Sequence, residues 1–320
     1  MLKIFASLRV TLISLVVLIG VSWWSYGAPA GSEAGVEWPL VATLAVLSLN
    51  LLAAIAVNRA FRAQLPLLIF HLALLALVIL VLASRLTYLQ GVTEVASGTA
   101  FTGLTSRQAG PFHSGAIDKV DFTSLGFTIT YLPGLKRDKT LNRAQVRTEG
   151  GLTRAVEFGD QEPLVVNGYR FYTSGNKGFS AILRWVPEQG DEQVGTVNFP
   201  GYPLYAAKQT SVWRIGPQEI QLTLNLQELL IDTARKDEFR MPKRHSITAD
   251  LGWRAVTLEP GQSFRLPAGE LSYLGLTTWM GYSVFYDWTM PWLLAACTLA
   301  VLALGWHFWS KFSVRPWQAE

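Results

Sequence analysis

The sequence predicts an integral membrane protein with four transmembrane α-helices, three before and one after a large extracytoplasmic antiparallel β-rich domain. Half of its 320 residues are hydrophobic and only 16% are charged, whereas soluble domains carry roughly 25% charged residues. The apolar residues gather in four stretches, each close to the ~20 residues that cross a bilayer. Between the third and fourth stretches, roughly 200 residues have the composition of short strands and turns.

The four spans are expected at residues 8–26, 38–57, 65–86 and 288–310. Residues 1–89 then form the helical N-terminal part, 90–287 the external domain, and 311–320 a cytoplasmic tail. The first span has the basic start and small-residue end (Gly27-Ala28-Pro29-Ala30) of a cleavable signal peptide. Trp23 and Trp24 close its apolar run and favour an uncleaved helix, because tryptophans gather at membrane interfaces.

Charged residues at the ends of the spans predict their direction, because cytoplasmic loops are enriched in lysine and arginine. The connection between spans one and two has no basic residue and two acids, Glu33 and Glu37. The basic residues lie at the opposite ends of the spans: Lys3, Arg9, Arg59, Arg62, Lys311 and Arg315. We therefore expect both termini in the cytoplasm and the β-rich domain outside it.

Short β-branched and aromatic runs predict the strands of the external domain. They are FTITY, AVEF, YRFYTS, AILRWV, IQLTLNL and ITADLGWRAVTL, separated by turns such as Pro133-Gly134, Pro200-Gly201 and Pro260-Gly261. Strands at this spacing are typical of an antiparallel sandwich or an open barrel. The segment LNLQELLIDTARKDEF is compatible with a short helix.

Several function classes lack their sequence signatures. There is no GxSxG, Walker loop, HExxH, GxGxxG or CxxCH motif, so we assign no catalytic residues. No basic cluster with interleaved aromatics suggests a nucleic-acid partner. The one cysteine, Cys297, lies in the last span and is interpreted as a small apolar residue. We expect the external acids, among them Asp118, Asp121, Asp232 and Asp237, to be solvated surface groups.

His71 is the residue most suggestive of chemistry, because it lies inside the third span. Ionisable side chains at membrane depth are costly and commonly serve a function. Imidazole is a good ligand for iron, and His71 is about 9 Å along the helix from the cytoplasmic end of its span. The alternative is a neutral histidine packed against a neighbouring helix by one hydrogen bond. His113 and His245 are isolated external histidines, for which a structural or solvated role is the simpler interpretation.

Two further residues are candidates around His71. Asn50 lies at a similar depth in the second span, so we expect it to hydrogen-bond one imidazole nitrogen and fix the tautomer. His307 lies near the cytoplasmic end of the fourth span among Trp306, Phe308 and Trp309. It is a possible second iron ligand from the same chain.

The order of these segments resembles the ResB family of cytochrome c biogenesis proteins along nearly the whole chain. The resemblance rests on four places: Ser7-Leu8-Arg9 before the first span, FHLALLALVILVLA in the third, PLVVNGYRFYTS at residues 163–174, and Gly281-Tyr282-Ser283-Val284 with Asp287 before the last span. Two features depart from the family. Asp287-Trp288-Thr289 stands where members often have Asp-Pro-Gly, and the chain is short, as expected of a divergent member.

The resemblance implies a function. ResB proteins work in the system II pathway of bacterial inner membranes with a polytopic ResC or CcsA partner, which carries a tryptophan-rich haem-binding segment absent here. Together they move haem b outward and join it to the CxxCH thiols of apocytochrome c. His71 matches the family's histidine on the third span, which is associated with transmembrane haem ligation. This chain would then be the companion subunit, and the second axial ligand would come from the partner or from His307.

Two other functions fit the residues alone. In one, the chain is a non-catalytic scaffold of a membrane complex and His71 is structural. In the other, it is an envelope sensor or transporter subunit whose β-rich domain binds a ligand. Haem bound at His71 would distinguish the ResB-like function from the scaffold and from the sensor or transporter subunit.

Overall fold

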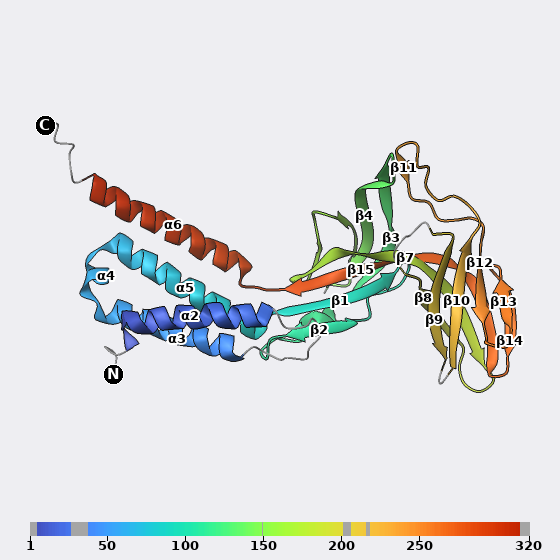
Figure 1. The fold of residues 1–320 in the computed structure, drawn as a ribbon, viewed down its shortest axis with the longest axis horizontal. Helices are drawn as coiled ribbons and strands as arrows, with labels where there is room; N and C mark the ends of the chain where they lie inside the picture. Colours follow the sequence, from blue (N-terminus) through green and yellow to red (C-terminus); the bar gives the residue numbers. More distant parts are fainter. Residues whose placement is uncertain (1–4, 27–37, 149, 201–205, 216–217, 314–320) are drawn as a thin grey trace. The chain divides into compact units, whose positions relative to one another are not determined.

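A computed structural model describes residues 5–26, 38–148, 150–200, 206–215 and 218–313. The chain divides into two compact units (Figure 1). The helical unit comprises Met1–Gln90, Arg107–Gly115 and Tyr286–Glu320, and the β unit comprises Gly91–Ser106 and Ala116–Phe285. Lys3, Glu33, Glu37, Arg315 and the turn at 201 lie outside the described residues.

Four helices of the helical unit are long and apolar enough to cross a membrane. They are α2 (Leu8–Tyr26), α3 (Trp38–Val57), α5 (Leu65–Thr87) and α6 (Met290–Phe312), with the short α4 (Arg59–Ala63) between α3 and α5. α3 packs against both α2 and α5, and α6 packs on α5. The first three long helices begin at the expected residues, and the lengths and composition are consistent with a multi-pass membrane protein.

α6 begins two residues later than the sequence predicted, at Met290. Thr289 is the N-cap residue, and Asp287 forms a turn before it. One carboxylate oxygen of Asp287 accepts the backbone N–H of Thr289 at 2.8 Å and its hydroxyl at 2.7 Å. The other oxygen accepts the Ser84 hydroxyl at 2.7 Å, so Asp287 also joins the start of α6 to the last turn of α5.

The β unit is built from antiparallel strand pairs, which confirms the predicted antiparallel β-rich region. The described strands form three sheets rather than one sandwich or barrel. The first has the order β2 (Ser106–Ala109), β1 (Leu89–Ala96), β15 (Gly269–Tyr286), β7 (Tyr169–Pro187), β6 (Leu164–Val166), with β14 (Ser263–Leu266) on β15 and β8 (Gln193–Asn198) on β7.

Two four-stranded sheets complete this unit. One has the order β13 (Ala255–Leu258), β12 (His245–Asp250), β10 (Gln218–Leu226), β9 (Lys208–Ile215). The other has the order β11 (Asp237–Glu238), β3 (Phe122–Leu132), β4 (Lys136–Arg147), β5 (Thr153–Gly159), and the 3₁₀ turn η1 (Ala116–Lys119) precedes β3. One buried apolar cluster joins strands of all three sheets, and its members include Leu222, Leu224, Ile247, Phe179 and Tyr273.

The predicted strands YRFYTS and AILRWV are two parts of one strand, β7, which pairs with β15 along most of its length. Thr173 pairs with Tyr282 and Lys177 with Met280, so residues 174–176 bulge out opposite Gly281. A Cβ at Gly281 would lie 2.6 Å from the Ser174 hydroxyl oxygen and 3.0 Å from the Asn176 carbonyl oxygen, so glycine leaves room for the bulge there. The bulge interrupts the alternation that marks a strand, which is why the sequence divided it.

The segment PLVVNGYRFYTS folds into the β6–β7 hairpin. Its turn residues Asn167 and Gly168 have φ of 51° and 82°, the left-handed backbone that an Asn-Gly turn provides. The strand after the turn buries Tyr169 and Phe171 completely. The Phe171 ring packs at 5.1 Å from that of Phe122. The motif therefore builds one of the cores of the β unit.

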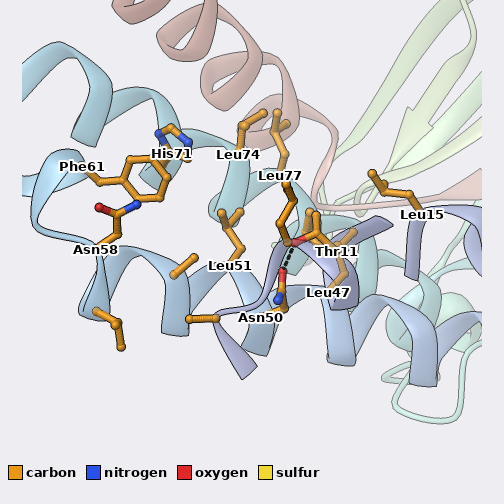
Figure 2. Close-up of a pocket in the computed structure, with 15 residues that line it drawn as sticks. Thr11, Leu15, Leu47, Asn50, Leu51, Asn58, Phe61, His71, Leu74 and Leu77 are labelled. Atoms are coloured by element: carbon orange, nitrogen blue, oxygen red, sulfur yellow. Dashed lines mark hydrogen bonds between the residues drawn. The ribbon is translucent and has the colours of Figure 1, made fainter. Parts of the chain in front are cut away.

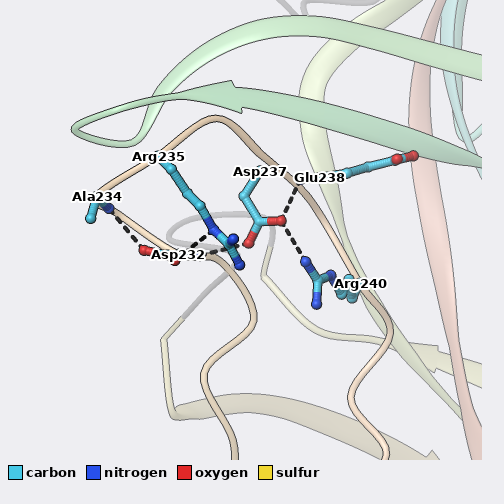
Figure 3. A network of polar contacts seen from close by, with 6 residues as sticks. All are labelled: Asp232, Ala234, Arg235, Asp237, Glu238 and Arg240. Atoms are coloured by element: carbon cyan, nitrogen blue, oxygen red, sulfur yellow. Dashed lines mark hydrogen bonds and ion pairs between the residues drawn. The ribbon is translucent and has the colours of Figure 1, made fainter.

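The expected short helix after β10 is wrong, because acidic side chains hold this segment as a loop (Figure 3). Asp237 accepts the backbone N–H groups of Asp232 at 2.8 Å and Glu238 at 3.0 Å, and the Arg240 guanidinium at 2.6 Å. These bonds, led by that from Asp232, lower the pKa of Asp237 to about 2. The Asp237 side chain is 9% exposed, so it is not the solvated acid that the sequence suggested.

His245 has a structural partner in the β unit. Its Nδ1 lies 2.8 Å from the hydroxyl of Tyr273, which is fully buried. Burial lowers the pKa of His245, and the nearby Glu228 carboxylate opposes that shift. The folded protein therefore favours the neutral imidazole, which accepts the hydrogen bond from the Tyr273 hydroxyl.

We expect acid to destabilise the β unit through His245. An unfolded histidine titrates near 6.5, and below this pH the unfolded chain binds a proton that the folded state resists. The free energy of unfolding therefore falls as the pH drops below that value and keeps falling through the lower folded pKa. Chemical denaturation at about pH 7.5 and pH 5 measures the loss. The loss should shrink in His245→Gln, which accepts the same hydrogen bond without titrating; an equal loss in both proteins contradicts the assignment.

Candidate functional site

A cavity of about 830 Å³ lies among α2, α3, α4 and α5 within the helical unit (Figure 2). This volume is within the range of small-molecule and cofactor sites. Its walls are mostly aliphatic, and its polar groups are few: Thr11, Asn50, Asn58 and His71. Among the described residues no acid or arginine lines it, so this part of the cavity suits a largely apolar ligand that makes a small number of directed contacts.

His71 contributes the imidazole of this cavity from the second turn of α5. Its Nδ1 lies 2.7 Å from the carbonyl oxygen of Leu67, one turn earlier. A carbonyl only accepts hydrogen bonds, so Nδ1 carries the hydrogen and donates it. In the neutral ring Nε2 then keeps its lone pair. A hydrogen bond from one ring nitrogen to a carbonyl is the arrangement that prepares the other nitrogen to bind a metal.

Phe61 of α4 stacks on His71, with the ring centroids 4.0 Å apart and the planes inclined by 26°. The position of Phe61 follows from the sharp turn between α3 and α5. There the side-chain oxygen of Asn58 accepts the backbone N–H of Ala60 at 3.0 Å and caps α4. The side chains of Asn58, Phe61 and His71 lie together at one end of the cavity (Figure 2). The imidazole is thus held by a hydrogen bond and by a stacked ring.

Asn50 lines the same cavity and is 2% exposed, but its hydrogen bonds join α3 to the N-terminal segment. Its Oδ1 accepts the Thr11 hydroxyl at 2.7 Å, and its Nδ2 donates to the carbonyls of Ser7, at 3.2 Å, and Phe5. Figure 2 shows Asn50 and Thr11 away from the His71 end. The expected bond from Asn50 to the imidazole is therefore replaced by that from His71 to Leu67.

The other candidate histidines lie outside the cavity. His307 does not line it and contacts the Phe308 ring at 5.7 Å in an edge-on arrangement. α6 runs antiparallel to α5, so His307 and His71 lie toward the same end of this helix pair. His113 bonds through Nδ1 to the carbonyl of Thr87 at 2.9 Å, at the opposite end of α5. Cys297 is exposed on α6.

Among the described residues that line the cavity, the His71 imidazole is the side chain suited to bind a metal. Within the described part of the chain, no group of three or more histidine, cysteine, aspartate or glutamate residues is placed to hold a metal ion. Iron in a porphyrin is held by the macrocycle, so a haem group would need the protein only for its axial positions. His71 would supply one axial nitrogen, and Phe61 and the aliphatic walls would contact the macrocycle. Arg59 and Arg62, in the same short helix as Phe61, are exposed cations suited to the haem carboxylates.

The sequence identified His71, but it did not identify Phe61 or Leu67 as its neighbours. His71 bonds to the backbone carbonyl of Leu67, and every residue has such a carbonyl. The identity of residue 67 therefore does not predict the hydrogen bond. Phe61 lies three residues after Asn58. The Asn58 cap can predict where the five-residue helix begins, but it does not predict that the Phe61 ring will stack on His71.

Comparison with models of known protein families finds no match for this chain. Comparison with characterised proteins finds no match either.

Proposed function

We propose that this protein is a companion membrane subunit of a system II cytochrome c synthase, and that it holds haem b transiently at His71. Its four apolar helices would cross the bacterial inner membrane, with both termini in the cytoplasm and the β unit in the periplasm. The observation that supports the proposal most strongly is the His71 imidazole at an apolar cavity, with Nδ1–H bonded to Leu67 and Nε2 left as a ligand.

The residues of the cavity have separate roles in this proposal. His71 binds iron through Nε2, and Leu67 fixes the tautomer that makes this possible. Phe61 orients the imidazole and adds an aromatic surface for the macrocycle. The aliphatic side chains exclude water from the iron. Asn50 and Thr11 fix the N-terminal helix against α3 and so close one wall of the cavity.

Partners complete the proposed function. A polytopic ResC or CcsA-type protein would receive the haem and carry out its attachment to apocytochrome c, because this chain has no tryptophan-rich haem segment and no catalytic motif. The second axial ligand would come from that partner, or from His307, which lies toward the same end of the helix pair as His71. The β unit would bind the partner or present the apocytochrome.

A reconstituted maturation assay tests this function. Cells without their own cytochrome c maturation system would express this chain, a polytopic partner and a reporter cytochrome with a CxxCH site. We expect covalent haem on the reporter, measured by haem staining of denaturing gels, only when this chain is present. Equal attachment when the chain is omitted would contradict the proposed function and favour the scaffold or sensor interpretation.

A further inference from the structure

The segment Arg107–Gly115, which includes most of β2, belongs to the helical unit, although it lies within the range expected to be external domain. It folds back along the end of α5. The backbone N–H of Gly110 donates to the carbonyl of Tyr88, and that of Phe112 donates to the carbonyl of Leu86, both at 2.9 Å. The imidazole of His113 bonds to the Thr87 carbonyl. Three successive carbonyls at the end of the helix thus hold the loop Gly110–Gly115, here called the return loop.

Gly110 makes this close approach possible. A Cβ at this position would lie 2.3 Å from the carbonyl carbon and oxygen of Leu86 and 2.7 Å from the Thr87 nitrogen. These are backbone atoms, so they cannot move aside cheaply. The return loop is therefore fixed at the level of the last turn of α5.

The return loop exposes the aromatic ring of Phe112. Phe112 is 69% exposed at the level of Leu86. The start of α6, at the same end of the helix pair, exposes Trp288 and Trp292. The Trp288 indole donates to the Thr87 hydroxyl at 2.9 Å, so it too is fixed at this level. Aromatic rings that gather at the ends of membrane-spanning helices mark the interface between hydrocarbon and water.

We propose that the return loop inserts Phe112 into the lipid at the bilayer interface where α5 ends and α6 begins. The inference rests on α5 and α6 crossing the membrane, as in the proposed function, but it is independent of haem. Lipid is the occupant that the surroundings favour, because the ring is level with the ends of two apolar helices, where two tryptophans are also exposed. The loop would then help to fix the depth of the helix pair.

A spin label tests the depth of the loop in the full-length protein, reconstituted in vesicles of phosphatidylethanolamine and phosphatidylglycerol. The chain has one cysteine, Cys297, which is exposed on α6 and serves as the lipid reference when labelled in the natural protein. Phe112→Cys in a Cys297→Ser background places the label on the loop. Lys139→Cys in the same background, on the charged strand β4, is the water reference.

Collisions of the label with oxygen and with a water-soluble nickel chelate give its depth. We expect the label at position 112 to lie about 5–10 Å below the headgroups, between the two references. Nickel access equal to that at position 139, or shielding from both reagents as in a protein contact, would overturn the inference. If the label on Cys297 is also open to nickel, the membrane arrangement itself is wrong, so the two failures are distinguishable.

Adding Gly110→Ala to the labelled Phe112→Cys protein tests what positions the loop. The new methyl group collides with Leu86, so we expect the label to move toward the nickel chelate. An unchanged depth would show that the carbonyls of α5 do not set the position of Phe112.

Discussion

Replacing His71 with alanine should reduce the affinity of the purified protein for haem by more than about tenfold, equivalent to ~1.4 kcal/mol of binding free energy. The substitution removes the Nε2 ligand and leaves the aliphatic walls, which hold the macrocycle but not its iron. The proposed axial bond is the most directional contact in the cavity, so no other single substitution there should cost as much. Haem titration followed by absorbance in detergent measures the change.

Two variants control for this result. His307→Ala removes the other histidine toward the same end of the helix pair, but it leaves the cavity lining intact. Asn50→Ala removes a polar group of the same cavity whose hydrogen bonds go to Phe5, Ser7 and Thr11 instead of His71. We expect the affinity for haem to fall less in either variant than in His71→Ala, because each keeps the His71 imidazole. Similar losses in His71→Ala and His307→Ala would contradict the distinction between the two histidines.

Replacing Phe171 with alanine should lower the free energy of unfolding of the β unit by about 3–5 kcal/mol. Phe171 is fully buried and packs against Phe122, with further edge contacts to Phe101 and Tyr282. The alanine would leave a cavity among these rings, and each of them would lose its packing contact with residue 171. Chemical denaturation of the full chain, followed by near-ultraviolet circular dichroism, measures the effect.

Tyr172 provides the matched control, because it is the next residue of β7 and points to the opposite face of the sheet. It is 40% exposed. Tyr172→Ala should change the free energy of unfolding by about 1 kcal/mol or less. Equal losses in the two variants would show that the β6–β7 hairpin does not build a core.

The sequence predicted the helices well because their signal is local and continuous. α2, α3 and α5 begin at the expected residues, since an apolar run bounded by polar residues fixes a helix without tertiary information. β7 shows the limit of such reasoning. Its bulge at 174–176 lies opposite Gly281 of β15, more than a hundred residues later, which has no side chain to crowd it. No local pattern contains that relation.

In the candidate site, too, the local feature can be predicted from the sequence but the tertiary contacts cannot. A histidine within an apolar helix is visible in sequence because polar residues are rare there, and His71 is a candidate for that reason. The neighbours of His71 depend on helix packing and rotation. Depth along two spans suggested Asn50, but the rotation of α3 turns this residue toward α2 and the backbone of its N-terminal segment. The short helix expected after β10 is absent because Asp237 binds the backbone N–H groups of Asp232 and Glu238 in a loop, and the local sequence does not reveal those contacts.

Ligation of haem iron by His71 is the central claim, and rescue by imidazole tests it most directly. His71→Gly removes the ligand and leaves space for a free imidazole beside Phe61. We predict that ferric haem gives an imidazole-ligated absorption spectrum with the natural protein, loses it with His71→Gly, and regains it when imidazole is added to that variant. A His71→Gly spectrum identical to that of the natural protein, before any imidazole is added, would contradict the account.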